Sequence, residues 1–158
     1  MSETISKLIL YSPYMNSFIY KFTKTLDGSS QKDRYEIYVH RKELIERLQN
    51  RLDICSAILI ASTPYDLDRI LRLQRFVDGL QLVMVLPDRD SDTIAKAHSF
   101  RPRFLTYVDG DFSEIISVLE KITDRFNQNQ WKVDDVSMKR NIEAIHNLEN
   151  PKDNRCLV

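Results

Sequence analysis

The sequence predicts an α/β fold in which five parallel strands form a doubly wound sheet, followed by an extra C-terminal helix. Two observations support this prediction. Short runs of β-branched and aliphatic residues alternate with segments of helical periodicity, which is typical of βαβ units. Three of these runs are almost continuously apolar. Such runs are expected of strands in a parallel sheet that helices cover on both faces.

The strand runs are separated by segments long enough for helical crossovers. They are KLILYS (7–12), YEIYVH (35–40), AILIAS (57–62), LQLVMVLP (80–87) and RFLTYVD (103–109). The first, third and fourth runs are the most apolar, so we expect them in the middle of the sheet. Right-handed crossovers at this spacing favour the flavodoxin-like strand order 2-1-3-4-5.

Each predicted strand is followed by a predicted helix with one apolar face. The helical segments are 15–28, 41–53, 64–79, 90–100 and 111–126. Gly28 and Gly79 are the expected C-terminal stops of the first and third helices, and Pro64 lies near a helix start. In the second helix, Leu52 is expected on the apolar face together with Leu44 and Leu48.

We predict two parts of the chain. Residues 1–127 form the (βα)5 domain, and residues 128–158 form a polar linker and a C-terminal amphipathic helix. The apolar stripe of this last helix contains Met138, Ile142, Ile145 and Leu148. This stripe either packs on the domain itself, builds a dimer or receives a partner.

The charge balance argues against some classes of partner. The 158 residues include 23 Lys and Arg and 23 Asp and Glu. A general nucleic-acid binder needs a surplus of cations, so nucleic acid is not an expected partner. The apolar runs are too short to span a bilayer, and the polar start MSETISK shows no signal-peptide pattern. We therefore expect a cytoplasmic protein without a membrane partner, in which Cys55 is buried.

On its (βα)5 rhythm over residues 7–126, the chain resembles the CheY-like receiver family of two-component signalling. The resemblance implies a phosphate-accepting aspartate after the third strand and an Mg²⁺-binding acidic pair after the first. It also implies a Ser or Thr after the fourth strand and a Lys after the fifth. The residues at these positions are Ser12, Pro13, Ala61, Ser62, Thr63, Pro87, Asp88, Val108 and Asp109. They lack the phosphotransfer groups, so the chain resembles a degenerate receiver, or pseudo-receiver.

Pseudo-receivers signal by binding other proteins, and receivers commonly dock partners through their fourth helix, fifth strand and fifth helix. By this resemblance we expect a non-enzymatic, phosphorylation-independent regulatory module that binds a protein partner and forms a homodimer. The residues of the expected interaction face are Ile94, His98, Tyr107, Ile115, Leu119, Ile142 and Ile145.

An alternative is a small-molecule or nucleotide site at the carboxyl ends of the strands, where open α/β sheets bind ligands. Its polar lining would be Ser12, Ser62, Thr63, Asp88 and Asp109. A weaker alternative is nucleic-acid binding through Arg69, Arg72 and Arg75, which otherwise form a solvated helix face paired with Asp66 and Asp68.

No catalytic, cofactor or metal motif is present in the sequence. The three glycines are too far apart for a phosphate-binding loop. The acidic stretch PDRDSD has Thr93 where a calcium loop needs glycine, and no two of the three histidines are spaced four residues apart. We therefore expect no cofactor, no metal and no catalytic residue.

Overall fold

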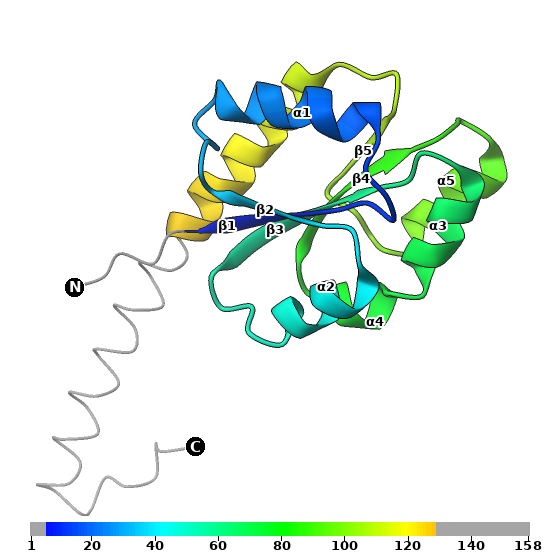
Figure 1. The fold of residues 1–158 in the computed structure, drawn as a ribbon, viewed down its shortest axis with the longest axis horizontal. Coiled ribbons are helices and arrows are strands. Elements are labelled where there is room, and N and C mark those ends of the chain that lie inside the picture. Colours follow the sequence, from blue (N-terminus) through cyan, green and yellow to red (C-terminus); the bar gives the residue numbers. More distant parts are fainter. Residues whose placement is uncertain (1–5, 129–158) are drawn as a thin grey trace, which may run out of the picture. The chain divides into compact units, whose positions relative to one another are not determined.

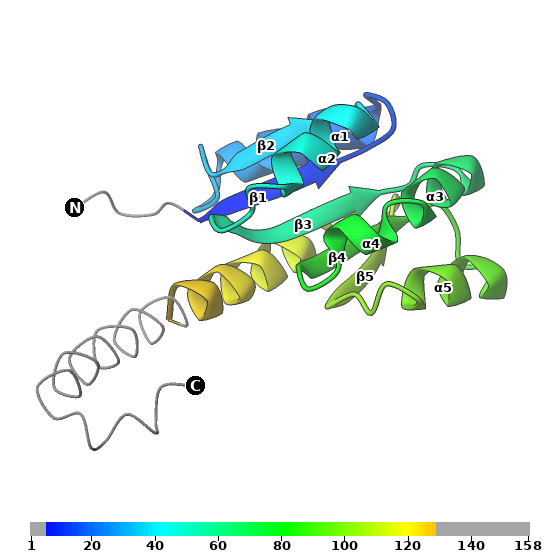
Figure 2. The same ribbon diagram turned by 90° about the horizontal axis from the view of Figure 1, so that it is seen from below.

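The computed structural model describes residues 6–128, which contain one five-stranded, entirely parallel sheet. The strands are β1 (Lys7–Tyr11), β2 (Tyr35–Tyr38), β3 (Ile54–Ile60), β4 (Gln81–Leu86) and β5 (Phe104–Tyr107). Their order in the sheet is β2-β1-β3-β4-β5 (Figures 1 and 2). The predicted strand order and fold class are therefore confirmed.

Helices cover both faces of the sheet (Figure 1). They are α1 (Ser17–Asp27), α2 (Arg41–Leu48), α3 (Pro64–Leu71), α4 (Gln74–Val77), α5 (Ser91–His98) and a further helix that begins at residue 112. Residues 112–123 of this helix belong to the first compact unit, and the described residues 124–128 are also helical. The extra C-terminal helix predicted within residues 128–158 lies outside the described residues.

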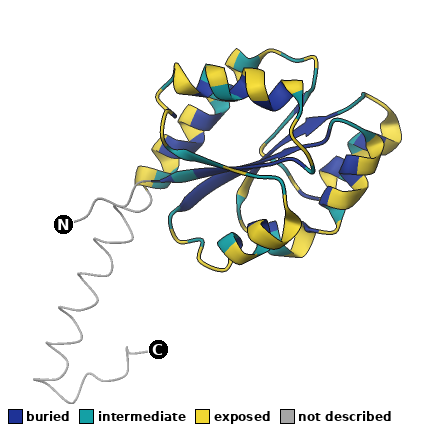
Figure 3. Ribbon diagram, viewed as in Figure 1, coloured by how far each residue is buried: buried dark blue, intermediate teal, exposed yellow. Residues whose placement is uncertain are grey.

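The central strands bury alternate side chains in two separate cores. Leu8, Leu10, Ile58 and Ile60 pack with α1 and the helix at 112–123, whereas Ile9 and Leu59 pack with α2, α3, α4 and α5. All seven residues of β3 are buried. Figure 3 shows the buried central strands between helices that are exposed on their outer sides. Burial on both faces explains why these strands are apolar without alternation.

Two helices differ from the sequence prediction. The second helix ends at Leu48, and Leu52, which was expected on its apolar face, is 83% exposed. The predicted helix at 64–79 divides into α3 and α4, because the chain turns at Arg72 and Leu73 so that Leu73 enters the core. Gly79 does follow α4, with a φ of 84° that L-residues rarely adopt.

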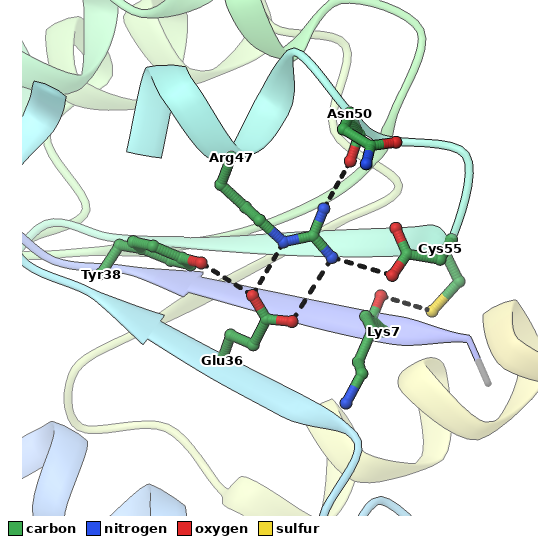
Figure 4. A network of polar contacts seen from close by, with 7 residues as sticks. Lys7, Glu36, Tyr38, Arg47, Asn50 and Cys55 are labelled. Carbon is green, nitrogen blue, oxygen red and sulfur yellow. Dashed lines mark hydrogen bonds and ion pairs between the residues drawn. The ribbon is translucent and has the colours of Figure 1, made fainter. Parts of the chain in front are cut away.

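An ion-pair network joins β2 to α2 and the start of β3 (Figure 4). Arg47 Nε lies 2.8 Å from Glu36 Oε1, and Arg47 Nη2 lies 2.9 Å from Asp53 Oδ2. The hydrogen bond from Arg47 lowers the pKa of Glu36. Desolvation and the hydrogen bond to Glu36 raise the pKa of Tyr38 to about 12. The network attaches the edge strand β2 to the sheet through polar side chains.

Cys55 is buried, as predicted, and its thiol donates to the carbonyl of Lys7 at 3.2 Å. No helix within residues 6–128 is both long and apolar enough to cross a membrane.

Candidate functional site

The carboxyl ends of β1 and β3 are adjacent, and a small polar cluster joins the loops that follow them. Ser12 is 1% exposed, and its hydroxyl donates to the carbonyl of Tyr14 at 2.8 Å. Asn16 Nδ2 donates to Ser12 Oγ at 3.3 Å and to Ser62 Oγ at 2.9 Å. Asn16 therefore links the two loops at the point where a receiver would hold its acceptor aspartate.

Asn16 has a second role at the start of α1. Its Oδ1 accepts a hydrogen bond from the backbone N–H of Ile19 at 3.1 Å, so Asn16 is the N-cap of α1. The amide oxygen thus accepts the hydrogen bond that caps the helix, while the amide nitrogen donates the hydrogen bonds that join the loops. An Asn before an apolar helical segment is a recognisable N-cap signal, so this role of Asn16 can be read from the sequence, whereas its bond to Ser62 cannot.

Asp66 is a residue whose surroundings the sequence prediction placed wrongly. It was expected on a solvated face as a partner of arginines, but it is 2% exposed. Its Oδ2 accepts from the backbone N–H of Ser62 at 3.2 Å, and its own N–H donates to Thr63 Oγ1. Asp66 thus reaches back one residue further than in a capping box, to Ser62 instead of the N-cap Thr63, and the Thr-x-x-Asp spacing was the available signal. Asp68, the other expected partner, pairs with Lys96 at 3.3 Å.

The loops after β4 and β5 are joined by a separate ion pair. Arg89 forms a bidentate pair with Asp109, with distances of 3.1 and 3.0 Å, and its guanidinium lies 4.1 Å from the centre of the Tyr107 ring. The hydrogen bond from Arg89 lowers the pKa of Asp109. Asp88 accepts the backbone N–H of Asp90 at 3.0 Å in a local turn. Both aspartates therefore already have structural partners.

A pocket of about 500 Å³ lies at these strand ends on the side of α1. Its polar lining includes Asn16, Ser17, Lys21, Ser62 and Asp109. Lys21 was not expected here, although Ser17 and Lys21 are four residues apart and so lie on one face of a helix. The pocket offers one cation, one carboxylate and neutral hydrogen-bonding groups to a ligand.

The structure brings together only part of the predicted site. Ser62, Val108 and Asp109 line this pocket, whereas Pro13 lines a different one and Ala61 is completely buried. No group of three or more His, Cys, Asp or Glu side chains in residues 6–128 is arranged to hold a metal ion. The predicted residues therefore share one edge of the sheet but not one cavity.

The expected interaction face requires a correction. Ile115 and Leu119 are fully buried, because they fill the core between the last described helix and the sheet. Ile94 is partly buried against the other core, and only His98 of the described residues in this set is exposed. Tyr107 lies beneath Arg89. Ile142 and Ile145 lie outside the described residues.

Comparisons with known proteins identify the fold. No protein-family model and no curated protein sequence matches the chain. Among solved structures, a CheY-like response regulator receiver domain from Methanospirillum hungatei matches with a TM-score of 0.61 and 9% identity, covering 79% of this chain and 98% of that one.

Two further solved structures match at similar levels. A protein described as pilus assembly-related from Burkholderia pseudomallei gives a TM-score of 0.56 and 16% identity, covering 78% of this chain and 93% of that one. A response regulator from Thermotoga maritima gives a TM-score of 0.53 and 11% identity, covering 76% of this chain and 98% of that one. The chain therefore has the CheY-like receiver fold.

Proposed function

We propose that the protein is a signalling module of the pseudo-receiver type, which acts through protein contacts without being phosphorylated at the strand ends. The observation that carries this proposal is the bridge from Asn16 to Ser62. The bridge between these loops is made by a neutral amide and a hydroxyl, whereas by the resemblance to receivers an acceptor carboxylate and a metal-binding acidic pair are expected there. Without these groups, phosphoryl transfer has neither its nucleophile nor its cation clamp.

The nearby carboxylates support the same proposal. Asp66 is buried and bonded to the backbone of Ser62, and Asp109 is paired with Arg89. A nucleophilic carboxylate must reach the phosphorus atom of its donor, whereas each of these groups has a structural partner. The strand-end loops are thus stabilised in one arrangement by their own side chains.

The test is incubation of the purified protein with radiolabelled acetyl phosphate and Mg²⁺, followed by gel autoradiography and acid or alkali treatment. We expect no acyl phosphate, which alkali would hydrolyse. An active receiver domain, labelled in parallel, is the positive control. Labelling that disappears with Asp66→Asn or Asp109→Asn would contradict the proposal.

A second candidate function is the binding of a small molecule in the pocket of about 500 Å³ beside Ser62. Its position at the carboxyl ends of β1 and β3 is where open α/β sheets bind ligands. A thermal-shift screen of nucleotides and other metabolites tests this function. A true ligand should raise the melting temperature of wild type but not of Lys21→Met, whereas Lys24→Met on the same helix is the matched control.

A further inference from the structure

A second pocket, of about 270 Å³, lies on the opposite side of the sheet from α1, between α2 and α3. Its lining residues are Tyr11, Pro13, Val39, His40, Arg41, Arg69 and Arg72. Three of the seven are arginines, and no Asp or Glu is among them. This composition differs from that of the pocket beside Ser62, whose lining includes one lysine and one aspartate.

The three arginines have no anionic partner in the part of the chain that the structure describes. Arg41, Arg69 and Arg72 make neither an ion pair nor a side-chain hydrogen bond within residues 6–128. By contrast, Arg47 and Arg89 each bind a carboxylate with two nitrogens. The guanidinium groups at this pocket are therefore available to a ligand.

Tyr11 provides an independent observation. As a whole residue, Tyr11 is 3% exposed, and it belongs to the core beneath the pocket. Its hydroxyl makes no hydrogen bond within residues 6–128. Burial raises the pKa of this hydroxyl, Arg41 and Arg69 lower it through their charges, and the nearby carboxylate of Asp66 raises it. The hydroxyl thus remains protonated at neutral pH, close to two guanidinium groups. Among the described residues only the Ser6 hydroxyl is fully buried without a hydrogen bond, so the Tyr11 hydroxyl is accessible from the pocket and can donate to a ligand oxygen there.

The start of α2 also borders this pocket. His40 is the N-cap residue, and its side chain makes no capping hydrogen bond. The first backbone N–H groups of a helix have no partner within the helix and favour negative charge. Arg41, which lines the pocket, is the first residue of α2. The helix start and the arginines therefore both favour an anionic ligand.

We propose that this pocket binds a small phosphate-bearing molecule, with Arg41, Arg69 and Arg72 around the phosphate and the Tyr11 hydroxyl donating to it. Guanidinium groups match the oxygens of phosphate with paired hydrogen bonds. A concave site of this volume fits a small molecule, and the zero net charge of the chain does not favour a long polyanion. The proposal is independent of whether the strand ends accept phosphate.

The arginines of the 69–75 segment supply a matched control. Arg75 lies outside this pocket, and its guanidinium stacks on Phe76 at 4.7 Å from the ring centre. The test is a titration of the full chain with inorganic phosphate and pyrophosphate at constant ionic strength, followed through the ¹⁵N–¹H signals of the arginine Nε groups. Wild type should show saturable shifts at Arg41, Arg69 and Arg72.

The variant R69Q/R72Q should bind pyrophosphate at least about tenfold more weakly, since each lost charged hydrogen bond is a large contribution. Y11F should bind about two- to tenfold more weakly, as expected for one neutral donor. R75Q should bind like wild type. Arg69 and Arg72 are exposed, so R69Q/R72Q should fold like wild type, and the amide spectrum of each variant checks that it is folded.

Two outcomes would overturn the proposal. The first is a wild-type titration without saturation, in which all arginine signals move together as they would under ionic screening. The second is an equal loss of affinity in R75Q and R69Q/R72Q, which would show attraction to general positive charge instead of a site.

Discussion

At the scale of single residues, Asn16 determines how the loops after β1 and β3 fit together. Its amide caps α1 and bridges to Ser62. We expect Asn16→Ala to lower the free energy of unfolding by about 1–2 kcal/mol, mainly through loss of the cap. Urea denaturation checks this value. Asn16→Asp is the control, because it keeps the acceptor oxygen for Ile19 and should lose less stability. Equal losses in both variants would contradict the capping role.

Glu36 gives a prediction about pH at the same scale. Its pKa is lowered in the folded protein by the hydrogen bond from Arg47, so its contribution to stability is fully present above its unfolded pKa of about 4.5. That contribution is lost as the pH falls through the lower, folded pKa. We therefore expect Arg47→Met to cost about 1.5–3 kcal/mol of unfolding free energy at neutral pH, and less in acid.

Urea denaturation of this variant at several pH values measures the effect. The matched control is Arg89→Met, because the Arg89–Asp109 pair is exposed on both sides and should matter little for stability. A cost of Arg47→Met that stays constant from neutral pH to pH ~3 would show that Glu36 is not the titrating partner.

At the scale of elements, the turn between β5 and the last described helix depends on a missing side chain. A Cβ atom at Gly110 would lie 2.5 Å from Thr106 Oγ1 and 3.0 Å from the carbonyl oxygen of Tyr107. We expect Gly110→Ala to destabilise the fold by about 1–3 kcal/mol through this overlap. In Gly28→Ala, the nearest such atom would be 3.7 Å away, so thermal unfolding should show little change or a slight gain. An unchanged melting temperature for Gly110→Ala would mean that the turn readily opens.

The strands and helices differ in how well the sequence predicted them. The strands were predictable, because burial on both faces of β1, β3 and β4 leaves long apolar runs. The break between α3 and α4 was not, since the apolar residues continue through it at helical spacing. The partner of Asp66, the backbone N–H of Ser62, was also not predictable. A carboxylate in the first turn of a helix can face either solvent or a loop, and only the tertiary structure determines which of the two it faces.

The candidate site was predictable in position but not in contacts. Parallel strands bring Ser62 and Asp109 to one edge, as expected from topology alone. The bridge from Asn16 and the bidentate pair of Arg89 connect residues from different loops, 46 and 20 positions apart, so no local pattern encodes them. The prediction of the interaction face was wrong at Ile115 and Leu119, which are buried in the core. An apolar stripe on a helix does not reveal whether the protein's own sheet or a partner covers it.

At the scale of the whole molecule, assembly is the property to measure. We expect a homodimer by light scattering of the full chain, and a folded monomer after truncation behind Asn127, if residues 128–158 carry the contact. Circular dichroism of the truncated chain separates loss of assembly from loss of folding. A monomer in both cases would move the search for the partner surface to the described domain.

The alternation of side chains between the two cores has a consequence for how such a protein can change over generations. Insertion of one residue within β3 would turn each following side chain of that strand to the opposite face, and so exchange residues between the two cores. Strand length is therefore as strictly constrained as strand composition. The loops beyond the strand ends carry no such constraint, so new binding chemistry can arise there while the interior is inherited unchanged.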